Sequence, residues 1–232
     1  VPDSDALDGL EFFDEELLYN VELGHRLRSA DGRLRSAITL FYMDRADQQV
    51  RGSLVIPRGD GSTAFVDYTD NAASGHNAGI EWELRALPTD RLETWLNLGL
   101  LRAEFDRYVN ADGRDLAGRD QAHAPRYQFA LGGTWHFSGG LAATVEWEGR
   151  DAFYFSDRHD ARAPAFEILH LRLAWEHDRW SAALWARNLL DEDYFVRGFG
   201  SFGNDPRKGY ITEEYVQFGD PRQLGINLEL RF

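Results

Sequence analysis

Hydrophobic and polar residues alternate along most of the chain with a period of two. The stretch "YQFALGGTWHF" (127–137) shows this pattern most fully. One of its faces carries Tyr127, Phe129, Leu131, Gly133, Trp135 and Phe137, and the other carries Gln128, Ala130, Gly132, Thr134 and His136. The same alternation runs through 18–27, 77–86, 141–150 and 168–177. This period predicts β-strands that have one apolar and one polar face.

The alternating segments predict an all-β fold of about nine strands. They lie near 15–28, 33–50, 62–86, 91–105, 124–137, 140–157, 163–176, 179–196 and 215–232. The connections alternate between short, turn-forming segments (29–32, 87–90, 138–139 and 177–178) and longer ones (51–61, 106–123, 158–162 and 197–214). This alternation is typical of an antiparallel up-and-down meander that has one tight edge and one loop-rich edge.

Aromatic residues distinguish between two architectures that fit this meander. In 127–137, Tyr127 opens the apolar face, and Trp135 and Phe137 close it. Ten steps of ~3.3 Å, tilted by ~40–45°, rise by roughly 23–25 Å, which matches the apolar band of a transmembrane barrel between its two aromatic girdles. The pattern therefore favours a membrane barrel, and the alternative is a soluble β-sandwich with these aromatic residues in its core. Girdle positions are also expected for Trp82, Trp147 and Trp175.

Composition excludes some functions and leaves the membrane interpretation open. The 232 residues include 25 Lys+Arg and 39 Asp+Glu, a net charge of −14, which argues against binding to nucleic acid. The chain has no cysteine and therefore no disulfide or cysteine metal site. A spanning helix needs about 18 consecutive apolar residues, and the sequence has no such run. A spanning strand needs only about 10 alternating residues, so a mean hydropathy of −0.48 is compatible with a barrel.

Five stretches carry short motifs that occur together in one protein family. Residues 15–50 combine an acidic entry, a Glu-Leu-Gly strand and an aromatic strand, and 77–105 combine a Gly-x-Glu strand with a Pro-containing turn. In 116–137 a Gly and then Ala-Pro precede a strand. "ARNLLDEDYF" (186–195) is similar to an Asn-Leu-Phe-Asp-x-x-Tyr signature, and "GDPRQLGINLELRF" (219–232) is similar to a closing Pro-Arg…Phe strand. Together, and in this order, they resemble the C-terminal part of a TonB-dependent outer-membrane receptor.

The resemblance implies a fold, a location and a function. Such receptors are barrels of about 22 strands with a plugged lumen, so residues 1–232 would be the C-terminal portion, without the plug and the early strands. An odd number of strands cannot close antiparallel by itself. The TonB complex, acting through the missing N-terminal part, would drive active uptake of a scarce nutrient across the Gram-negative outer membrane. The expected substrate is a ferric siderophore. The alternatives are a passive outer-membrane pore, an outer-membrane enzyme and a soluble acidic β-sandwich that acts as a binding module.

The closing strand has a second expected role. The alternation of 225–232 continues to the last residue, which is aromatic. By the same resemblance, this pattern is the recognition signal for the barrel-assembly machinery, which could read the strand by pairing with its edge. A plain lipid-facing strand without a signal is the alternative interpretation. The signal residues would be Gln223, Gly225, Leu228, Leu230 and Phe232.

The sequence contains none of the usual catalytic motifs, so we expect neither an enzyme nor a cofactor. The seven His residues show no ligand spacing, and no metal site is expected. The loop at 110–120 lacks the ligand order of a calcium loop and is interpreted as solvated. The pairs Glu81/Glu83 and Glu146/Glu148 are expected on a lumen wall, where arginines would neutralise them.

Ligand contacts are expected on the loop-rich edge, because loops carry most binding residues. Segments 151–162 and 196–210 combine aromatic residues with arginine, a combination suited to an aromatic, anionic ligand. For Phe153 and Phe155, a place in the outer aromatic girdle is the preferred interpretation. The candidate ligand-binding residues are Arg158, Arg197, Phe199, Phe202 and Arg207.

Overall fold

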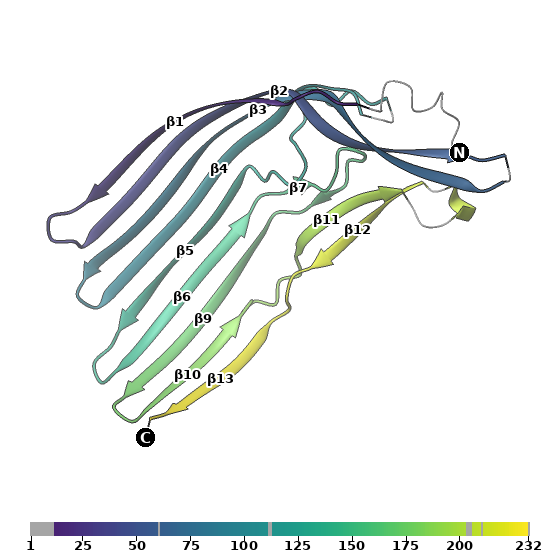
Figure 1. Ribbon diagram of the computed structural model, residues 1–232. Helices are drawn as coiled ribbons and strands as arrows, with labels where there is room; N and C mark the ends of the chain where they lie inside the picture. The colour runs from purple at the N-terminus through teal and green to yellow at the C-terminus, as the bar shows by residue number, and fades with distance from the viewer. Residues whose placement is uncertain (1–11, 60, 111–112, 203–205, 210, 232) are drawn as a thin grey trace.

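One curved antiparallel sheet forms most of the protein. The computed structural model describes residues 12–231 except 60, 111–112, 203–205 and 210, and the side chains of 53–55, 57, 65, 199–202 and 212 are also left undescribed. Nine strands pair in the order β1-β2-β3-β4-β5-β6-β9-β10-β13, and the sheet is open (Figure 1). Their bounds are β1 (Leu17–Arg28), β2 (Leu34–Pro57), β3 (Thr63–Thr89), β4 (Leu92–Tyr108), β5 (Tyr127–His136), β6 (Leu141–Arg150), β9 (Phe166–His177), β10 (Trp180–Arg187) and β13 (Gln223–Leu230).

The order and direction of the strands confirm the predicted meander. Each strand of the sheet runs antiparallel to its neighbours, so β1 and β13 run in the same direction. Among the described residues, each of these two strands pairs on one side only. The sheet therefore ends in two open edges, as the odd strand count implies.

Tight turns join the strands at one edge, at or next to the short connections that the sequence predicts. They occupy 29–33, 90–91, 137–140 and 178–179. In the turn between β5 and β6, Gly140 has a φ of 82°, and a Cβ atom there would lie 2.2 Å from the carbonyl oxygen of Glu176. Glycine is therefore needed at this turn, because the chain takes a positive φ there and passes close to the end of β9.

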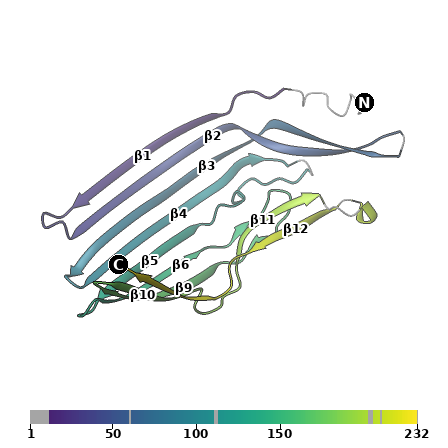
Figure 2. The ribbon, with the colours of Figure 1, turned by 60° about the horizontal axis from the view of Figure 1, so that its bottom comes forward.

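Longer connections at the opposite edge form two small sheets. Strands β7 (Phe153–Tyr154) and β8 (Arg162–Ala163) pair within the connection between β6 and β9. Strands β11 (Phe195–Phe202) and β12 (Thr212–Phe218) pair within the connection between β10 and β13, which also contains the short 3-10 helix η2 (Pro206–Lys208). In the turned view, the β11–β12 hairpin and the far end of the β2–β3 hairpin extend beyond the sheet on the same side (Figure 2).

The prediction of a loop at 51–61 is wrong. Strands β2 and β3 continue through this region as a long hairpin, pairing from Arg51↔Thr69 to Pro57↔Thr63. The segments "LVI" (54–56) and "AFV" (64–66) are rich in apolar and β-branched residues, which favour strands over a loop. Only 58–62 connect the two strands.

Two strands end earlier than the sequence predicts, and one predicted strand is divided in two. Strand β6 stops at Arg150 and β10 at Arg187, and 215–232 are divided between β12 and β13. The break after β10 has a local cause, because Asn188 and Asp191 adopt positive φ values of 46° and 61°. Such residues leave the extended region and end a strand.

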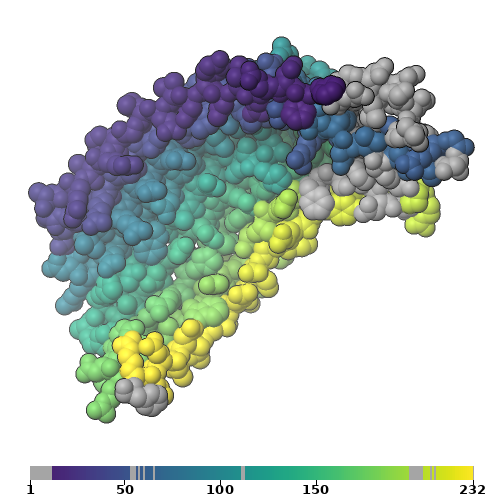
Figure 3. All heavy atoms as spheres, in the orientation of Figure 1, coloured from purple at the N-terminus to yellow at the C-terminus, as the bar shows by residue number. Residues whose placement is uncertain are grey.

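The two faces of the sheet differ as the alternation predicted. Leu173, Leu184 and Leu228 have exposed fractions of 39%, 53% and 77%, so no second sheet covers the apolar face among the described residues. The soluble β-sandwich alternative is therefore wrong. The visible side of the space-filling view is a curved wall, hollowed along the middle strands (Figure 3). Buried clusters lie at the loop edge: Ala73, Phe105, Tyr108 and Leu116 in one, and Phe153, Phe155 and Ala163 in the other.

Aromatic side chains border the apolar face at both edges. Trp175 and Trp180 pack together at the turn edge with ring centroids 5.4 Å apart. Tyr127 lies at the loop end of β5. Trp147 pairs in register with Leu131, midway between Tyr127 and Trp135, so its expected girdle position is wrong.

No helix among the described residues has the length and hydrophobicity needed to cross a membrane.

Candidate functional site

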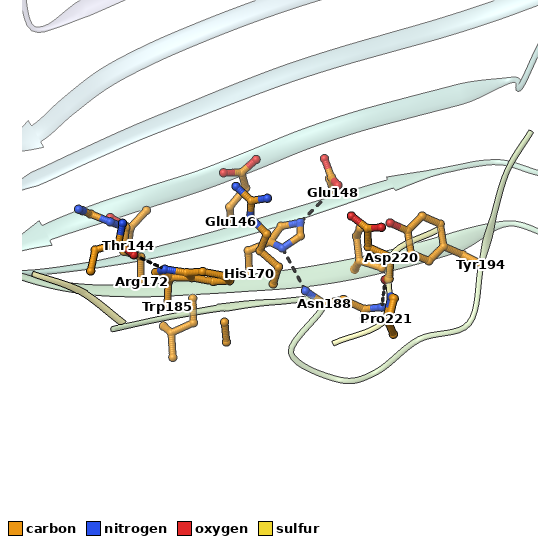
Figure 4. Close-up of a pocket in the computed structure, with 15 residues that line it drawn as sticks. Thr144, Glu146, Glu148, His170, Arg172, Trp185, Asn188, Tyr194, Asp220 and Pro221 are labelled. Atoms are coloured by element: carbon orange, nitrogen blue, oxygen red, sulfur yellow. Dashed lines mark hydrogen bonds and ion pairs between the residues drawn. The ribbon is translucent and has the colours of Figure 1, made fainter. Parts of the chain in front are cut away.

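A recess lies on the polar face of the sheet, at its β13 end (Figure 4). Its volume is about 630 Å³, and its walls come from β6, β9, β10, β13 and the segments that flank β11 and β12. Every second residue of a strand faces this side, which brings charged side chains from separate strands together. The labelled lining residues are Thr144, Glu146, Glu148, His170, Arg172, Trp185, Asn188, Tyr194, Asp220 and Pro221.

His170 stands at the centre of this recess with both ring nitrogens engaged. The backbone N–H of Asn188 donates to Nδ1 over 3.2 Å, and Nε2 lies 3.3 Å from Oε1 of Glu148. An Nδ1 that accepts a hydrogen bond places the proton of the neutral ring on Nε2, which then donates to the carboxylate. The recess offers hydrogen-bonding groups to a polar partner, and its lining contains no serine or cysteine nucleophile.

Asn188 connects the two chain segments that close the recess. Its side chain is fully buried, with an exposed fraction of 2%. Nδ2 donates to the carbonyl oxygens of Glu192 (2.8 Å) and Asp220 (3.1 Å), and Oδ1 accepts from the N–H of Glu192 (2.9 Å). Asp191 adds a bond, because its Oδ1 accepts from the N–H of Arg222 (2.9 Å). The signature 186–195 is thus a structural clamp between the end of β10 and the start of β13.

The loop edge is packed rather than open. Phe153 and Phe155 are 2% and 3% exposed and pack with Ala163, while Phe195 packs against this cluster. Arg150, at the end of β6, donates to the carbonyl oxygens of Phe195 and Val196. Arg150 therefore holds β11 over the top of the sheet. The expected girdle positions of Phe153 and Phe155 are wrong, because both rings are buried inside this cluster.

A second polar contact area links the β4 loop to the β7–β8 hairpin. The hydroxyl of Tyr108 donates to Oδ2 of Asp157 over 2.5 Å, and Nδ2 of Asn110 donates to the carbonyl oxygen of Asp157 over 2.9 Å. Burial raises the pKa of the Tyr108 phenol, and the bond to Asp157 raises it further. A recess of about 190 Å³ lies beside this contact, between the loops and the β2–β3 hairpin.

Comparison with known proteins assigns this architecture to a family. The family model for the β-barrel of TonB-dependent receptor-like proteins matches residues 5–189. The chain belongs to the TonB-dependent receptor β-barrel family. Barrels of this family lie in the Gram-negative outer membrane, and such barrels turn an apolar face to lipid and a polar face to the lumen. We therefore call the apolar face of this sheet its lipid side and the polar face its lumen side.

Solved receptor structures share the fold. The ferric yersiniabactin uptake receptor FyuA from Yersinia pestis superposes with a TM-score of 0.69 at 20% identity, over 94% of this chain and 30% of that one. The ferric-catecholate import receptor Fiu from E. coli K12 gives 0.67 at 17% identity, over 95% and 28%. The siderophore receptor PiuA from Acinetobacter baumannii gives 0.68 at 15% identity, over 91% and 28%. The chain thus spans less than a third of each of these receptors.

The predicted ligand-binding residues are spread over the loop edge of this receptor barrel. Arg158 is half-buried and lines the 190 Å³ recess, together with Tyr68 and Asp70. Arg197 is exposed on β11, and Arg207 is exposed on η2. Neither of these two lines the recess of Arg158. Phe199 and Phe202 belong to β11, but their side chains lie outside the described residues.

The carboxylate pairs do face the lumen side, but their expected arginine partners are absent. Glu146 and Glu148 line the 630 Å³ recess, and Glu81 and Glu83 line a neighbouring one of about 480 Å³. Among the described residues no arginine lies within ion-pairing distance of any of the four, and Glu148 pairs with His170 instead. The arginine-neutralised wall was therefore a wrong prediction. Glu81, Glu83 and Glu146 make no ion pair with any residue that the structure describes.

The predicted assembly signal lies on an edge strand. Gln223 and Gly225 face the lumen side of β13, and Leu228 and Leu230 face the lipid side with exposed fractions of 77% and 68%. A Cβ atom on Gly225 would lie 2.2 Å from the indole ring of Trp185, so the glycine makes room for that ring. Phe232 lies outside the described residues. The free edge is compatible with recognition by strand pairing, which remains a prediction.

Acidification is expected to loosen the β7–β8 hairpin. Nδ1 of His159 accepts the N–H of Ala161 over 3.2 Å, and burial lowers the pKa of His159. Its unfolded counterpart takes up a proton near pH 6.5. The stabilisation by neutral His159 is therefore present above about pH 6.5 and is lost as the pH falls below it.

Hydrogen exchange of 153–163 at pH 7.5 and 5.5, corrected for intrinsic rates, measures this effect. We expect severalfold faster opening at pH 5.5 in the wild type. His159→Asn provides the control, because its Oδ1 can still accept the Ala161 N–H and the side chain does not titrate. The same pH response in both proteins would show that another group is responsible.

Sequence reasoning missed the residues that organise the loop edge. The alternation of 141–150 puts Arg150 on the polar face and predicts nothing further of it, and no pattern in the sequence marks Arg119. Neither is marked by a motif, because their partners are backbone carbonyl groups of distant loops: Phe195 and Val196 for Arg150, and Ser156 and His159 for Arg119. The only available signal was an arginine beside a strand end in an acidic chain.

Proposed function

We propose that the chain forms about nine strands, the C-terminal portion, of a barrel of about 22 strands in the Gram-negative outer membrane. We further propose that the complete receptor takes up a ferric siderophore by TonB-dependent active transport. The observation that carries the proposal is the open nine-stranded sheet, which has one exposed apolar face and two unpaired edges among the described residues.

The apolar face and the open edges support a membrane barrel. Leu184, Ile226 and Leu228 expose 53%, 71% and 77% of their surface, a costly arrangement in water. Lipid would cover this face. Unpaired backbone groups at an edge are not tolerated in the hydrocarbon region, so β1 and β13 need further strands on either side. A barrel about two and a half times larger supplies them.

The chemistry of the recesses supports transport rather than catalysis. The 630 Å³ recess offers carboxylates, an imidazole and a guanidinium on separate strands, and its lining contains no serine or cysteine beside His170. The energy source would be the TonB complex, acting through a part of the receptor that precedes these strands. The loops would contact ligand on the outside, since the tight turns mark the periplasmic edge.

The substrate class is supported by likeness and by charge. FyuA and Fiu are receptors for ferric yersiniabactin and ferric catecholate, and PiuA is a siderophore receptor. Many ferric chelates carry negative charge, and arginine binds such oxygen-rich anions well. Arg158, Arg197 and Arg207 would supply this charge, and Phe199 and Phe202 would stack on aromatic parts of the chelate.

Uptake of radioactive iron by cells that produce the receptor tests the proposal. We expect one class of ferric siderophore to be accumulated, and an uncoupler of the proton-motive force to stop accumulation while surface binding continues. Arg158→Gln and Arg197→Gln should each weaken binding about tenfold, because each removes a charged hydrogen-bond donor. Accumulation that persists after uncoupling would instead indicate a passive pore.

A matched control comes from the opposite edge. Arg91 is exposed in the turn between β3 and β4, and Arg91→Gln removes the same charge far from the loops. It should bind the chelate like the wild type. Equal loss in all three variants would indicate a general charge effect, and no loss in any would remove Arg158 and Arg197 from the binding surface.

A further inference from the structure

A recess at the loop edge gathers positive charge in an acidic protein. Its volume is about 320 Å³. The chain as a whole carries a net charge of −14, yet this lining combines three arginines with two carboxylates. The lining residues are Gly118, Arg119, Asp120, Arg126, Asp151, Tyr154 and Arg162.

Arg119 gives the recess a buried guanidinium. Its side chain is nine-tenths buried, and Nη2 donates to the carbonyl oxygens of Ser156 (2.8 Å) and His159 (2.6 Å). Its Nε and Nη1 atoms are buried without a hydrogen-bond acceptor. The nearest carboxylate oxygen, on Asp160, is 3.6 Å away, and Asp160 also pairs with Arg114 at 2.6 Å. A buried charge that is compensated so weakly is costly unless an anion approaches it.

Two accessible arginines stand beside it. Arg162 is exposed and makes no ion pair with any described residue, and its guanidinium carbon lies 4.6 Å from the centroid of the Tyr154 ring. The guanidinium carbon of Arg119 lies 3.9 Å from the same centroid. The Tyr154 ring therefore holds two cations close together by cation–π attraction. The side chain of Arg126 is 60% exposed and forms an ion pair with Asp120, in which Nε lies 3.1 Å from Oδ2.

The position of Arg126 places this recess on the lipid side of the barrel. Nη2 of Arg126 is 3.9 Å from Oε1 of Glu104. Glu104 projects from the same face of β4 as Leu98 and Leu100, because alternate residues of a strand share a face. That face is the apolar one.

The height of the recess matches the membrane surface. Arg126 directly precedes Tyr127, which opens the apolar face of β5. The N–H of Asp151 donates to the carbonyl oxygen of Tyr127 over 2.9 Å, so Asp151 is at the same level. Charged side chains just beyond an aromatic girdle meet lipid headgroups, and basic pockets there bind anionic ones.

We propose that this recess binds a phosphate group of an anionic glycolipid in the outer leaflet. Arg162 and Arg126 would contact the phosphate oxygens, and Arg119 would attract them through its charge from the floor. Guanidinium groups suit phosphate because they donate in pairs. A chelate on its way into the lumen would not meet this recess, which opens on the opposite side of the wall. The proposal rests on the membrane position of the barrel and not on the identity of the transported ligand.

Native mass spectrometry of the detergent-purified receptor, titrated with bisphosphorylated lipid A, tests the proposal. We expect saturable binding that Arg162→Gln weakens about fivefold, and that Arg126→Gln together with Arg162→Gln weakens about twenty-fivefold, since each surface arginine has about this effect on an anionic headgroup. Arg162→Lys keeps the charge and should remain close to wild type. Arg91→Gln is the matched control at the other edge.

Three outcomes would overturn the proposal. Arg162→Gln could bind lipid A like the wild type while its folded state is intact by heat-dependent gel mobility. Dephosphorylated lipid A could bind equally well, which would leave phosphate without a role. Inorganic phosphate could displace lipid A at equal concentration, which would make this a site for a soluble anion. Loss of siderophore uptake has no bearing on these measurements.

Discussion

Replacing Asn188 by leucine is expected to prevent the receptor from keeping its folded state. The change removes two donated hydrogen bonds and one accepted bond, and it buries the backbone groups of Glu192 and Asp220 without partners. Each such group costs about 1–3 kcal/mol. Leucine also has to adopt the positive φ of 46° that asparagine tolerates, at a further cost of about 1 kcal/mol or more. The sum approaches the whole stability of an ordinary domain.

The amount of folded receptor in the outer membrane, and its resistance to unfolding on heated gels, measure this effect. Asn188→Asp keeps the acceptor oxygen and the tolerance of positive φ, so it should lie between leucine and wild type. Leu190 is the matched control in the same motif, because it is 71% exposed. Leu190→Phe should fold normally. A normal yield of the Asn188→Leu protein would show that the clamp does not hold β10 and β13 together.

The sheet could be predicted from the sequence because its cause is local. Each strand in 127–137 or 168–177 carries its own alternation, and the tight turns carry their own glycine and aspartate signals. The order of strands then follows, since short turns join antiparallel neighbours. The hairpin of β2 and β3 was misjudged because Gly52 and Arg51 resemble loop residues. In the structure, Gly52 makes room for the ring of Tyr68, which a Cβ atom would approach to 2.2 Å.

The loop edge could not be predicted because its contacts join distant segments. Tyr108 meets Asp157 across 49 residues, and Arg150 meets Phe195 across 45. No periodicity encodes such pairs. The girdle positions predicted for Phe153 and Phe155 are wrong for this reason. In the sequence, two aromatic residues beyond the end of a strand fit an aromatic girdle and a buried cluster equally well. What decides between them is Arg150, which brings β11 over the strand end.

Polar substitutions in the closing strand are expected to separate a sorting signal from a plain lipid-facing strand. Leu224, Ile226, Leu228 and Leu230 all lie on the lipid side of β13, the exposed apolar face, with exposed fractions of 69%, 71%, 77% and 68%. If the strand only faces lipid, a polar residue should lower the stability of the barrel at each of these four positions, and most at the position deepest in the membrane. If the assembly machinery reads the strand, Leu228→Asn, Leu230→Asn and Phe232→Ser should abolish insertion, whereas Leu224→Asn and Ile226→Asn should only lower stability.

Insertion in cells and folding into detergent micelles should be compared for each variant. The signal interpretation requires that Leu230→Asn and Phe232→Ser fold in micelles nearly as well as Ile226→Asn while they fail in cells, because only the cellular reaction involves the machinery. Gly225→Val should fail in both, since its side chain would enter the Trp185 ring. If all lipid-facing variants lose insertion and refolding in parallel, β13 acts as an ordinary wall strand. Pairing of the edge strand β13 with its neighbour in the barrel would then be driven only by the cost of unpaired backbone groups in lipid.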